Sequence, residues 1–426
     1  MKKWLLRISL GFLALLLLLY AFVFLRSVIP ATVNDEGLRL ERASIPEGSN
    51  AFEVLKVAAS HLWSPDKHSP QIYDLLGSTN WDDALASTVL ASNRETLAGW
   101  DAAAKLPDMQ VPEFSKVDDA SMLTYLSDWK RLAQLAMVRQ NSLLHNGQDK
   151  KAFDQIVNHI RLGQQMQNAD GVLICYLVGL AVENMGFYQM QHWVGKTHLT
   201  PAELKDYIRQ LQSPPDATAT AFANTMKAEY RCQTGWLVDM SQRGKFINPA
   251  SGDNYPRPMR WLPAFNSSQT KALFAKGDLM LAQAASHHYN ETKFPDLNSR
   301  PSLASMYLSG NAVGQITYYM MLPAVTAILA KKSQCDVQLQ AARTILALRA
   351  YQLTQGRLPP DLDALVPEFL ESVPVDDFNG QPLHYSAERK IVYSVGKNLK
   401  DDGGDDRSSD VPDSQRHLDL VYKFDF

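Results

Sequence analysis

Hydrophobic residues fill the start of the chain without a charge from Ile8 to Leu25. A helix over this run extends about 27 Å, close to the hydrocarbon thickness of a bilayer. Lys2, Lys3 and Arg7 precede the run, and acidic residues follow it from Asp35. By the positive-inside rule, this pattern predicts a single-pass transmembrane helix with a cytoplasmic N-terminus.

A cleaved signal peptide is the alternative for this segment. Signal peptides have an apolar run of roughly 7–15 residues and a small-residue cleavage site. Here the run is longer and Arg26 follows it directly. We therefore expect residues 1–26 to be a cytoplasmic stub and a retained anchor in a bacterial inner membrane, with the bulk of the chain extracytoplasmic.

Polar residues at 27–50, interrupted by prolines and a glycine, predict a linker, and helical spacing follows over 51–335. One apolar stripe consists of Met122, Tyr125, Trp129, Leu132 and Ala136. Another begins at Ala152, after a turn at Gly147. We expect these two helices to form an antiparallel hairpin, and the body to be built from such hairpins.

Three further segments of the body have distinct patterns. Val172 to Val182 is apolar on all sides but too short to span a bilayer, which predicts a buried core helix. Thr200 and Pro201 are typical of a helix start. Val313 to Ala330 is largely apolar but contains Gln315, which favours a core helix; a second membrane span is the alternative.

Residues 336–426 predict a small α+β module. A helical stripe begins at Leu339 and ends before Gly356, which is suited to closing a helix. Alternating apolar residues then predict three half-buried strands, around Tyr385, at 391–395 and at 418–426. The predicted fold is therefore mainly α, with an N-terminal transmembrane helix, a helical body and a C-terminal helix packed on a three-stranded antiparallel sheet.

Composition and motifs narrow the chemistry only slightly. The net charge of −3 gives no reason to expect a nucleic-acid partner. Cys175 lies in an apolar run and is expected to be buried, whereas a Cys232–Cys335 disulfide is an open alternative in an oxidising compartment. His287 and Glu291 lie one helical turn apart, and we expect them on a surface helix. Phosphate-binding loops and nucleophile elbows are absent from the sequence.

Six aspartates crowd the loop between the second and third predicted strands, with two glycines among them. They are Asp401, Asp402, Asp405, Asp406, Asp410 and Asp413. Calcium suits such a loop because it accepts 6–8 oxygen ligands in flexible geometry. A solvated acidic loop is the alternative.

The C-terminal module resembles the periplasmic domain of the major pseudopilin of type II secretion. The resemblance rests on Gly356, Leu358-Pro359, Val373-Pro374, Asp377-Phe378, Gly380, Tyr393-Ser394-Val395-Gly396 and Gly403-Gly404. It implies a calcium ion held by Asn398, Asp402, Asp405 and Asp410. Asp376-Asp377 stands where the family has Asp-Pro, and some 300 residues separate the anchor from this module.

The leading hypothesis is a membrane-anchored envelope protein, non-enzymatic, that binds protein partners of the cell envelope and has a calcium-stabilised loop. A component of a type II secretion-like apparatus is one alternative. The other is an extracytoplasmic hydrolase with its site in the helical body. A hydrolase predicts a deep pocket lined by at least two titratable residues, whereas a smooth body with a hydrophobic groove favours partner binding.

Overall fold

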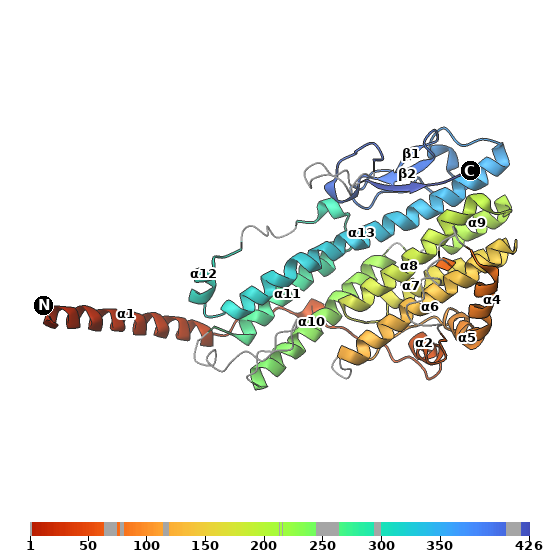
Figure 1. Cartoon of the computed structure of the whole chain (residues 1–426). Coiled ribbons are helices and arrows are strands. Elements are labelled where there is room, and N and C mark those ends of the chain that lie inside the picture. The colour runs from red at the N-terminus through yellow and green to blue at the C-terminus, as the bar shows by residue number, and fades with distance from the viewer. Residues whose placement is uncertain are drawn as a thin grey trace. The chain divides into compact units, whose positions relative to one another are not determined.

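The structure is a computed structural model that describes residues 2–63, 75–76, 81–113, 119–212, 214, 216–243, 264–293, 300–405 and 419–426. Helices dominate it (Figure 1): α1 (Lys2–Val28), α2 (Ala51–Ser60), α4 (Asp83–Ser92), α5 (Arg94–Ala103), α6 (Asp119–His145), α7 (Asp149–Gln167), α8 (Leu173–Trp193), α9 (Pro201–Gln210), α10 (Ala217–Arg243), α11 (Ser267–Ala284), α12 (Leu303–Leu308) and α13 (Ala312–Gln355). The strands β1 (His384–Ser386), β2 (Ile391–Ser394) and β3 (Leu420–Lys423) form one antiparallel sheet in that order. The predicted helical character, N-terminal apolar helix and C-terminal sheet are confirmed.

The chain divides into two compact units, each assembled from separate stretches of sequence. Unit 1 comprises Met1–Glu41, Met226–Gln283 and Lys293–Ile328. Unit 2 comprises Arg42–Thr225, Ala284–Thr292 and Leu329–Phe426. The long helices α10 and α13 each contribute to both units. The segment predicted as a core helix at Val313 to Ala330 is thus the first part of a 44-residue helix.

Helices α7 and α8 form the closest helix pair of unit 2. A Cβ atom on Gly163 would lie 2.4 Å from the backbone nitrogen of Glu183, and one on Gly186 would lie 2.5 Å from Ile160. Residue 163 therefore faces 183 while 160 faces 186, so the two helices run in opposite directions. Glycine at these positions permits the backbones to approach within a distance that side chains would prevent.

One carboxylate is buried between helices in this core. Glu183 accepts hydrogen bonds from Gln164 (2.9 Å), Gln167 (2.6 Å) and the Cys335 thiol (2.8 Å). Burial raises the pKa of Glu183 despite these donors. All three cysteines lie in described parts of the chain as thiols, so the alternative of a Cys232–Cys335 disulfide is not realised. Cys175 is buried, as predicted.

Local signals in the sequence placed several helix ends correctly. Thr200 forms a capping box with Glu203 at the start of α9, with Pro201 in the first turn. The helices α6 and α13 end just before Gly147 and Gly356, whose φ angles are 66° and 72°. These left-handed conformations are accessible to glycine without a steric penalty and close each helix as predicted.

The sheet of unit 2 lies beside the second half of α13 (Figure 1). Arg349 of α13 lies over the ring of Phe426, 5.2 Å from its centroid, and Tyr385 donates a hydrogen bond to the carbonyl of Pro359. The buried side chains of Val392 and Tyr422 pair across β2 and β3. The C-terminal sheet is therefore part of the same core as this half of the helix.

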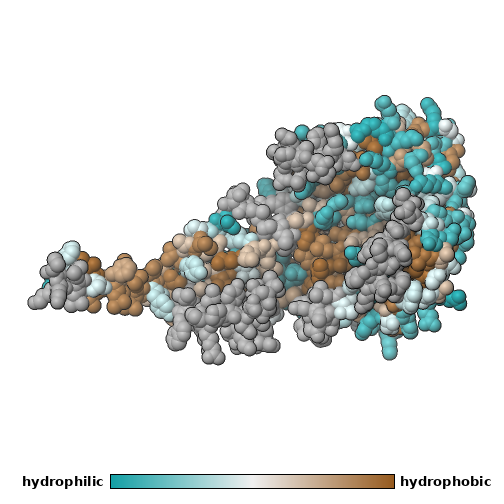
Figure 2. Space-filling model, viewed as in Figure 1, coloured by the Kyte–Doolittle hydropathy of each residue, from teal (hydrophilic) through white to brown (hydrophobic). Residues whose placement is uncertain are grey.

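Unit 1 contains the N-terminal helix α1, whose apolar side chains are exposed along its length (Figure 2). Its segment Arg7–Val28 is long and apolar enough to cross a membrane, and none of its most apolar window is buried. A window of α13 passes the same test but is 36% buried. The expected linker contributes to the unit, since Leu38 is buried and Asp35 pairs with Lys271 at 2.8 Å.

Candidate functional site

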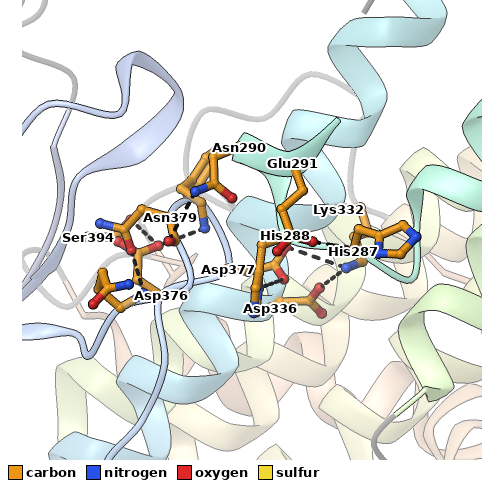
Figure 3. A network of polar contacts seen from close by, with 12 residues as sticks. His287, His288, Asn290, Glu291, Lys332, Asp336, Asp376, Asp377, Asn379 and Ser394 are labelled. Carbon is orange, nitrogen blue, oxygen red and sulfur yellow. Dashed lines mark hydrogen bonds and ion pairs between the residues drawn. The ribbon is translucent and has the colours of Figure 1, made fainter. Parts of the chain in front are cut away.

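Unit 2 contains a polar cleft of about 450 Å³ between the second half of α13, the segment after α11 and a turn before the sheet (Figure 3). Its titratable lining residues are Asp216, His287, His288, Glu291, Lys332, Asp336, Arg343 and Asp377. We refer to this site as the polar cleft. Lys332, Asp336 and Arg343 lie four and seven residues apart, so they share one face of α13.

Backbone hydrogen bonds fix the segment after α11 against the turn before the sheet. The amides of Tyr289 and Asn290 donate to the carbonyls of Asp377 (2.9 Å) and Phe378 (3.0 Å). The Asn290 side chain also donates to the carbonyl of Asn379 (3.1 Å). Residues far apart in sequence therefore form a firm wall of the cleft.

Asp376 holds the turn that carries Asp377. One of its oxygens accepts from the Phe378 amide and the Ser394 hydroxyl, both at 2.9 Å, and the other accepts from the Val395 amide at 3.0 Å. Its side chain is fully buried, and burial raises its pKa although these donors oppose the rise. Asp376 is thus a structural anchor, and Asp377 is the carboxylate that reaches the cleft.

Lys332 bridges two carboxylates at the base of the cleft. Its Nζ lies 2.8 Å from Asp336 Oδ2 and 3.4 Å from Asp377 Oδ2, and only 6% of the lysine side chain is exposed. Burial alone would lower the pKa of Lys332, but the two carboxylates outweigh it and raise the pKa. The pKa of Asp336 is raised, first by burial and also by the charge of Asp377, although Lys332 opposes the rise. Lys332 is therefore a charged structural cation rather than a neutral nucleophile.

Two imidazoles line the mouth of the cleft. His288 Nδ1 lies 3.3 Å from Asp377 Oδ1, and its ring packs on Gly380, where a Cβ would approach it to 2.9 Å. His287 Nδ1 lies 3.6 Å from Glu291 Oε2. A carboxylate that orients an imidazole is the arrangement from which general bases are built.

Arg343 lies at the other end of this face of α13. Its Nη1 is 3.5 Å from Gln340 Oε1, and its buried Nε has no hydrogen-bond partner. Across the described parts of the chain, no carboxylate lies within ion-pair distance of this guanidinium. A half-buried guanidinium in this state is suited to binding a carboxylate or phosphate from a ligand.

A larger hollow of about 730 Å³ in unit 2 is lined by sixteen residues, of which five have amide side chains and four are charged. Several of these amides are already engaged, since Gln164 bonds Glu183, Gln165 bonds the carbonyl of Leu106, and Asn168 bonds the carbonyl of Gln164. The polar cleft differs from this hollow because it brings two histidines together with a lysine, an arginine and several carboxylates.

The structure brings together two of the four residues implied to bind calcium. Asn398 Nδ2 donates to Asp402 Oδ2 at 3.0 Å, while Lys400 Nζ lies 2.9 Å from Asp402 Oδ1. Asp405 is also described, whereas Asp410 lies outside the described residues. No cluster of three or more potential metal-binding side chains is found in the described ranges.

Asp419, which the sequence did not single out, organises the described start of the acidic loop. Its carboxylate accepts hydrogen bonds from the backbone amides of Asp402 (3.1 Å) and Gly404 (2.7 Å). Burial raises its pKa. Asp419 therefore holds the described start of the loop near the start of β3, and Arg389 of the β1–β2 turn also donates to the carbonyls of Gly403 and Gly404.

Sequence reasoning missed the polar cleft. It placed His287 and Glu291 on a surface helix, whereas α11 ends at Ala284 and both residues lie at the cleft, Glu291 in a short 3-10 helix (Tyr289–Glu291). It treated Asp377 as a turn residue of the pseudopilin resemblance. The adjacent pair Asp376-Asp377 was the sequence signal that could have indicated the cleft, because one aspartate of such a pair can anchor a turn while the other faces a cavity.

Comparisons with protein families, with curated proteins and with solved structures found no match to this chain. The resemblance of the C-terminal module to the major pseudopilin therefore stays a prediction.

Proposed function

We propose that this protein is anchored in a membrane by α1 and that its extracytoplasmic part binds a short peptide with free termini in the polar cleft. The observation that carries this proposal is one face of α13 that has a carboxylate at one end and a guanidinium at the other. Asp336 and Arg343 lie seven residues apart on it, which is about 10 Å along the helix axis. An extended peptide of three residues has about the same length.

The charges of the cleft match the two ends of such a ligand. Arg343 offers to the terminal carboxylate a guanidinium that feels the charge of Glu371 but has no ion-pair partner among the described residues. At the opposite end, Asp336, Asp377 and Glu291 outnumber the single ammonium of Lys332 and attract the terminal amine. The sequence predicted that the protein binds protein partners of the cell envelope. The proposed peptide ligand assigns that binding to the polar cleft.

Calorimetric titration of the full chain in detergent with trialanine tests this proposal. Wild type is expected to bind trialanine at least tenfold more tightly than trialanine amide, because only the free acid forms a charged pair with Arg343. The R343Q variant should lose this preference. R209Q, which alters an exposed arginine of α9, is the matched control and should retain it. Equal affinity for acid and amide in wild type, or no binding, would contradict the proposal.

An extracytoplasmic hydrolase is the second candidate function. The pairing of His288 with Asp377 favours it, because an oriented imidazole is able to activate a water molecule against a bound peptide. The same incubations distinguish the two functions, since release of alanine from trialanine would establish hydrolysis. Stable binding without cleavage would favour a binding protein.

We also propose that calcium stabilises the acidic loop, held by Asn398, Asp402, Asp405 and Asp410. The adjacency of Asn398 and Asp402 supports this assignment, and the ion would screen carboxylates that otherwise repel one another. The Lys400 ammonium now supplies part of that positive charge at Asp402. A calcium ion bound here would therefore displace the Lys400 ammonium from Asp402 or bind beside it.

Calcium is expected to raise the melting temperature of the full chain by several degrees, and magnesium is not. Saturation at about 100 times the dissociation constant adds about 2.7 kcal/mol to the unit that contains the site. The double variant D402N/D405N should abolish the rise, whereas E388Q, an exposed change in the β1–β2 turn, should preserve it. An unchanged rise in the double variant would rule out these ligands.

A further inference from the structure

The short helix α12 exposes most of its apolar surface. Leu303, Tyr307 and Leu308 are 65%, 48% and 40% exposed, and Met306 is the one residue of this helix that is buried. Leu303 and Tyr307 are four residues apart and share a face, while Ser305 lies on the opposite side. Exposed apolar side chains concentrated on one short element indicate a surface that is covered in use.

The loop that follows α12 is fixed to the end of α1, within unit 1. A Cβ atom on Gly310 would lie 2.4 Å from the Ser27 amide nitrogen and 2.7 Å from the Arg26 carbonyl carbon. This close approach to backbone atoms, together with the φ of 78°, explains why glycine occupies the position. The apolar helix is therefore attached where α1 ends.

The start of α11 fixes the same point from another side. Asn266 donates to the carbonyls of Ser27 and Ile29, both at 2.8 Å, and Gln269 donates to the carbonyls of Arg26 (3.1 Å) and Ile29 (2.9 Å). Asn311, just before α13, accepts from the Asn266 amide at 2.9 Å. These bonds satisfy the last carbonyl groups of α1 and hold α12 at a defined height along it.

We propose that α12 is a membrane-interface element whose Leu303 and Tyr307 insert into the lipid bilayer beside α1. This inference rests on the proposed anchor. The span Arg7–Val28 is about 33 Å long, so the hydrocarbon boundary falls near its final turn, where α12 is attached. Tyrosine is favoured at such boundaries, and Arg300, exposed three residues before Leu303, suits lipid phosphates.

The occupant is lipid rather than another protein because the apolar surface continues directly from the anchor. Val28 and Ile29, at the end of α1, are exposed like the side chains of α12. Exposed apolar residues therefore lie both at the end of α1 and on α12, which is attached there. Insertion at both places would fix the tilt and height of unit 1 relative to the bilayer.

Fluorescence of the full chain in phosphatidylcholine–phosphatidylglycerol nanodiscs tests the proposal. A C232S background leaves two buried cysteines, and an environment-sensitive label is attached to L303C or Y307C. Both labels are expected to fluoresce at least twofold more strongly than a label on S305C and to be quenched by nitroxide-bearing lipids. The label on L16C reports on the anchor itself.

Each outcome distinguishes this inference from the proposed anchor. The inference would be overturned if the labels at 303 and 307 fluoresced as weakly as the label at 305. The anchor would still stand in that case if lipid nitroxides quenched the label at 16. Bright labels at 303 and 307 that lipid nitroxides do not quench would show a protein partner in place of lipid. An unquenched label at 16 would refute the anchor.

Discussion

Replacing Lys332 with methionine is expected to lower the free energy of unfolding by about 3–5 kcal/mol, the loss that follows when one partner of a buried ion pair is removed. Methionine keeps most of the volume but leaves Asp336 and Asp377 without their shared cation. Chemical denaturation of the full chain in detergent measures the loss. K331M alters the exposed neighbour, whose ammonium donates to Gln334 at 3.1 Å, and should change stability by less than about 0.5 kcal/mol.

The loss in K332M should also depend on pH. The pKa of Asp336 is already raised in wild type, and removing the ammonium raises it further. A carboxyl with a raised folded-state pKa favours the fold at low pH and loses that contribution as pH rises through the folded pKa. The deficit of K332M should therefore shrink as pH falls from 7 toward 4. A deficit below about 1 kcal/mol at pH 7 would contradict a charged, buried Lys332.

Substituting Gly163 with alanine is expected to destabilise the protein by about 2 kcal/mol. Alanine normally favours a helix over glycine by about 1 kcal/mol. Here the added methyl would meet the backbone nitrogen and Cα of Glu183 at 2.4 and 2.6 Å, and neither is able to swing aside. Separating α7 from α8 would cost about 1–3 kcal/mol from overpacking and would weaken the hydrogen bonds around Glu183 as well.

G235A provides the matched control for G163A. Gly235 lies within α10, and a Cβ atom there would meet nothing within 4 Å. The substitution should therefore raise stability by about 0.5–1 kcal/mol through helix propensity alone. If G163A were also stabilising, the close contact between α7 and α8 would be wrong.

The sequence predicted correctly those elements that depend on interactions between residues close together in the chain. The apolar run at Ile8 to Leu25, the cap at Thr200 and the closing glycine at Gly356 each depend on residues within a few positions of one another. The apolar residues at 391–395 likewise predicted β2, although Val392 and Ser394 on the opposite face are buried as well, so the strand is not half-buried as expected.

The polar cleft could not be predicted in this way because it depends on long-range contacts. His288 and Asp377 lie 89 residues apart, and Lys332 lies between them in sequence on a third element. Each of these residues has an ordinary neighbourhood in the sequence. The hydrogen bonds of the 289–290 segment to the turn at 377–379 bring His288 to Asp377, and the ion pair with Asp377 brings in Lys332.

The length of α13 was also missed for a physical reason. Lys331 and Lys332 follow the apolar residues of Val313 to Ala330, so this segment was treated as separate from the stripe beginning at Leu339. The structure has one continuous helix across both. This continuity places Lys332 and Asp336 in the middle of a helix and on the same face as Arg343.

The membrane topology tests the central claim most directly, because the proposed peptide site, calcium site and lipid contact of α12 all presuppose an anchored chain with its body outside the cytoplasm. The measurement is labelling by a membrane-impermeant maleimide in bacteria with a permeabilised outer membrane, using K151C, an exposed position of α7, in the C232S background. K3C is the cytoplasmic control. We predict that K151C is labelled in intact inner membranes and that K3C is labelled only after lysis. Labelling of K151C only after lysis, or recovery of the chain in the soluble fraction, would contradict the account.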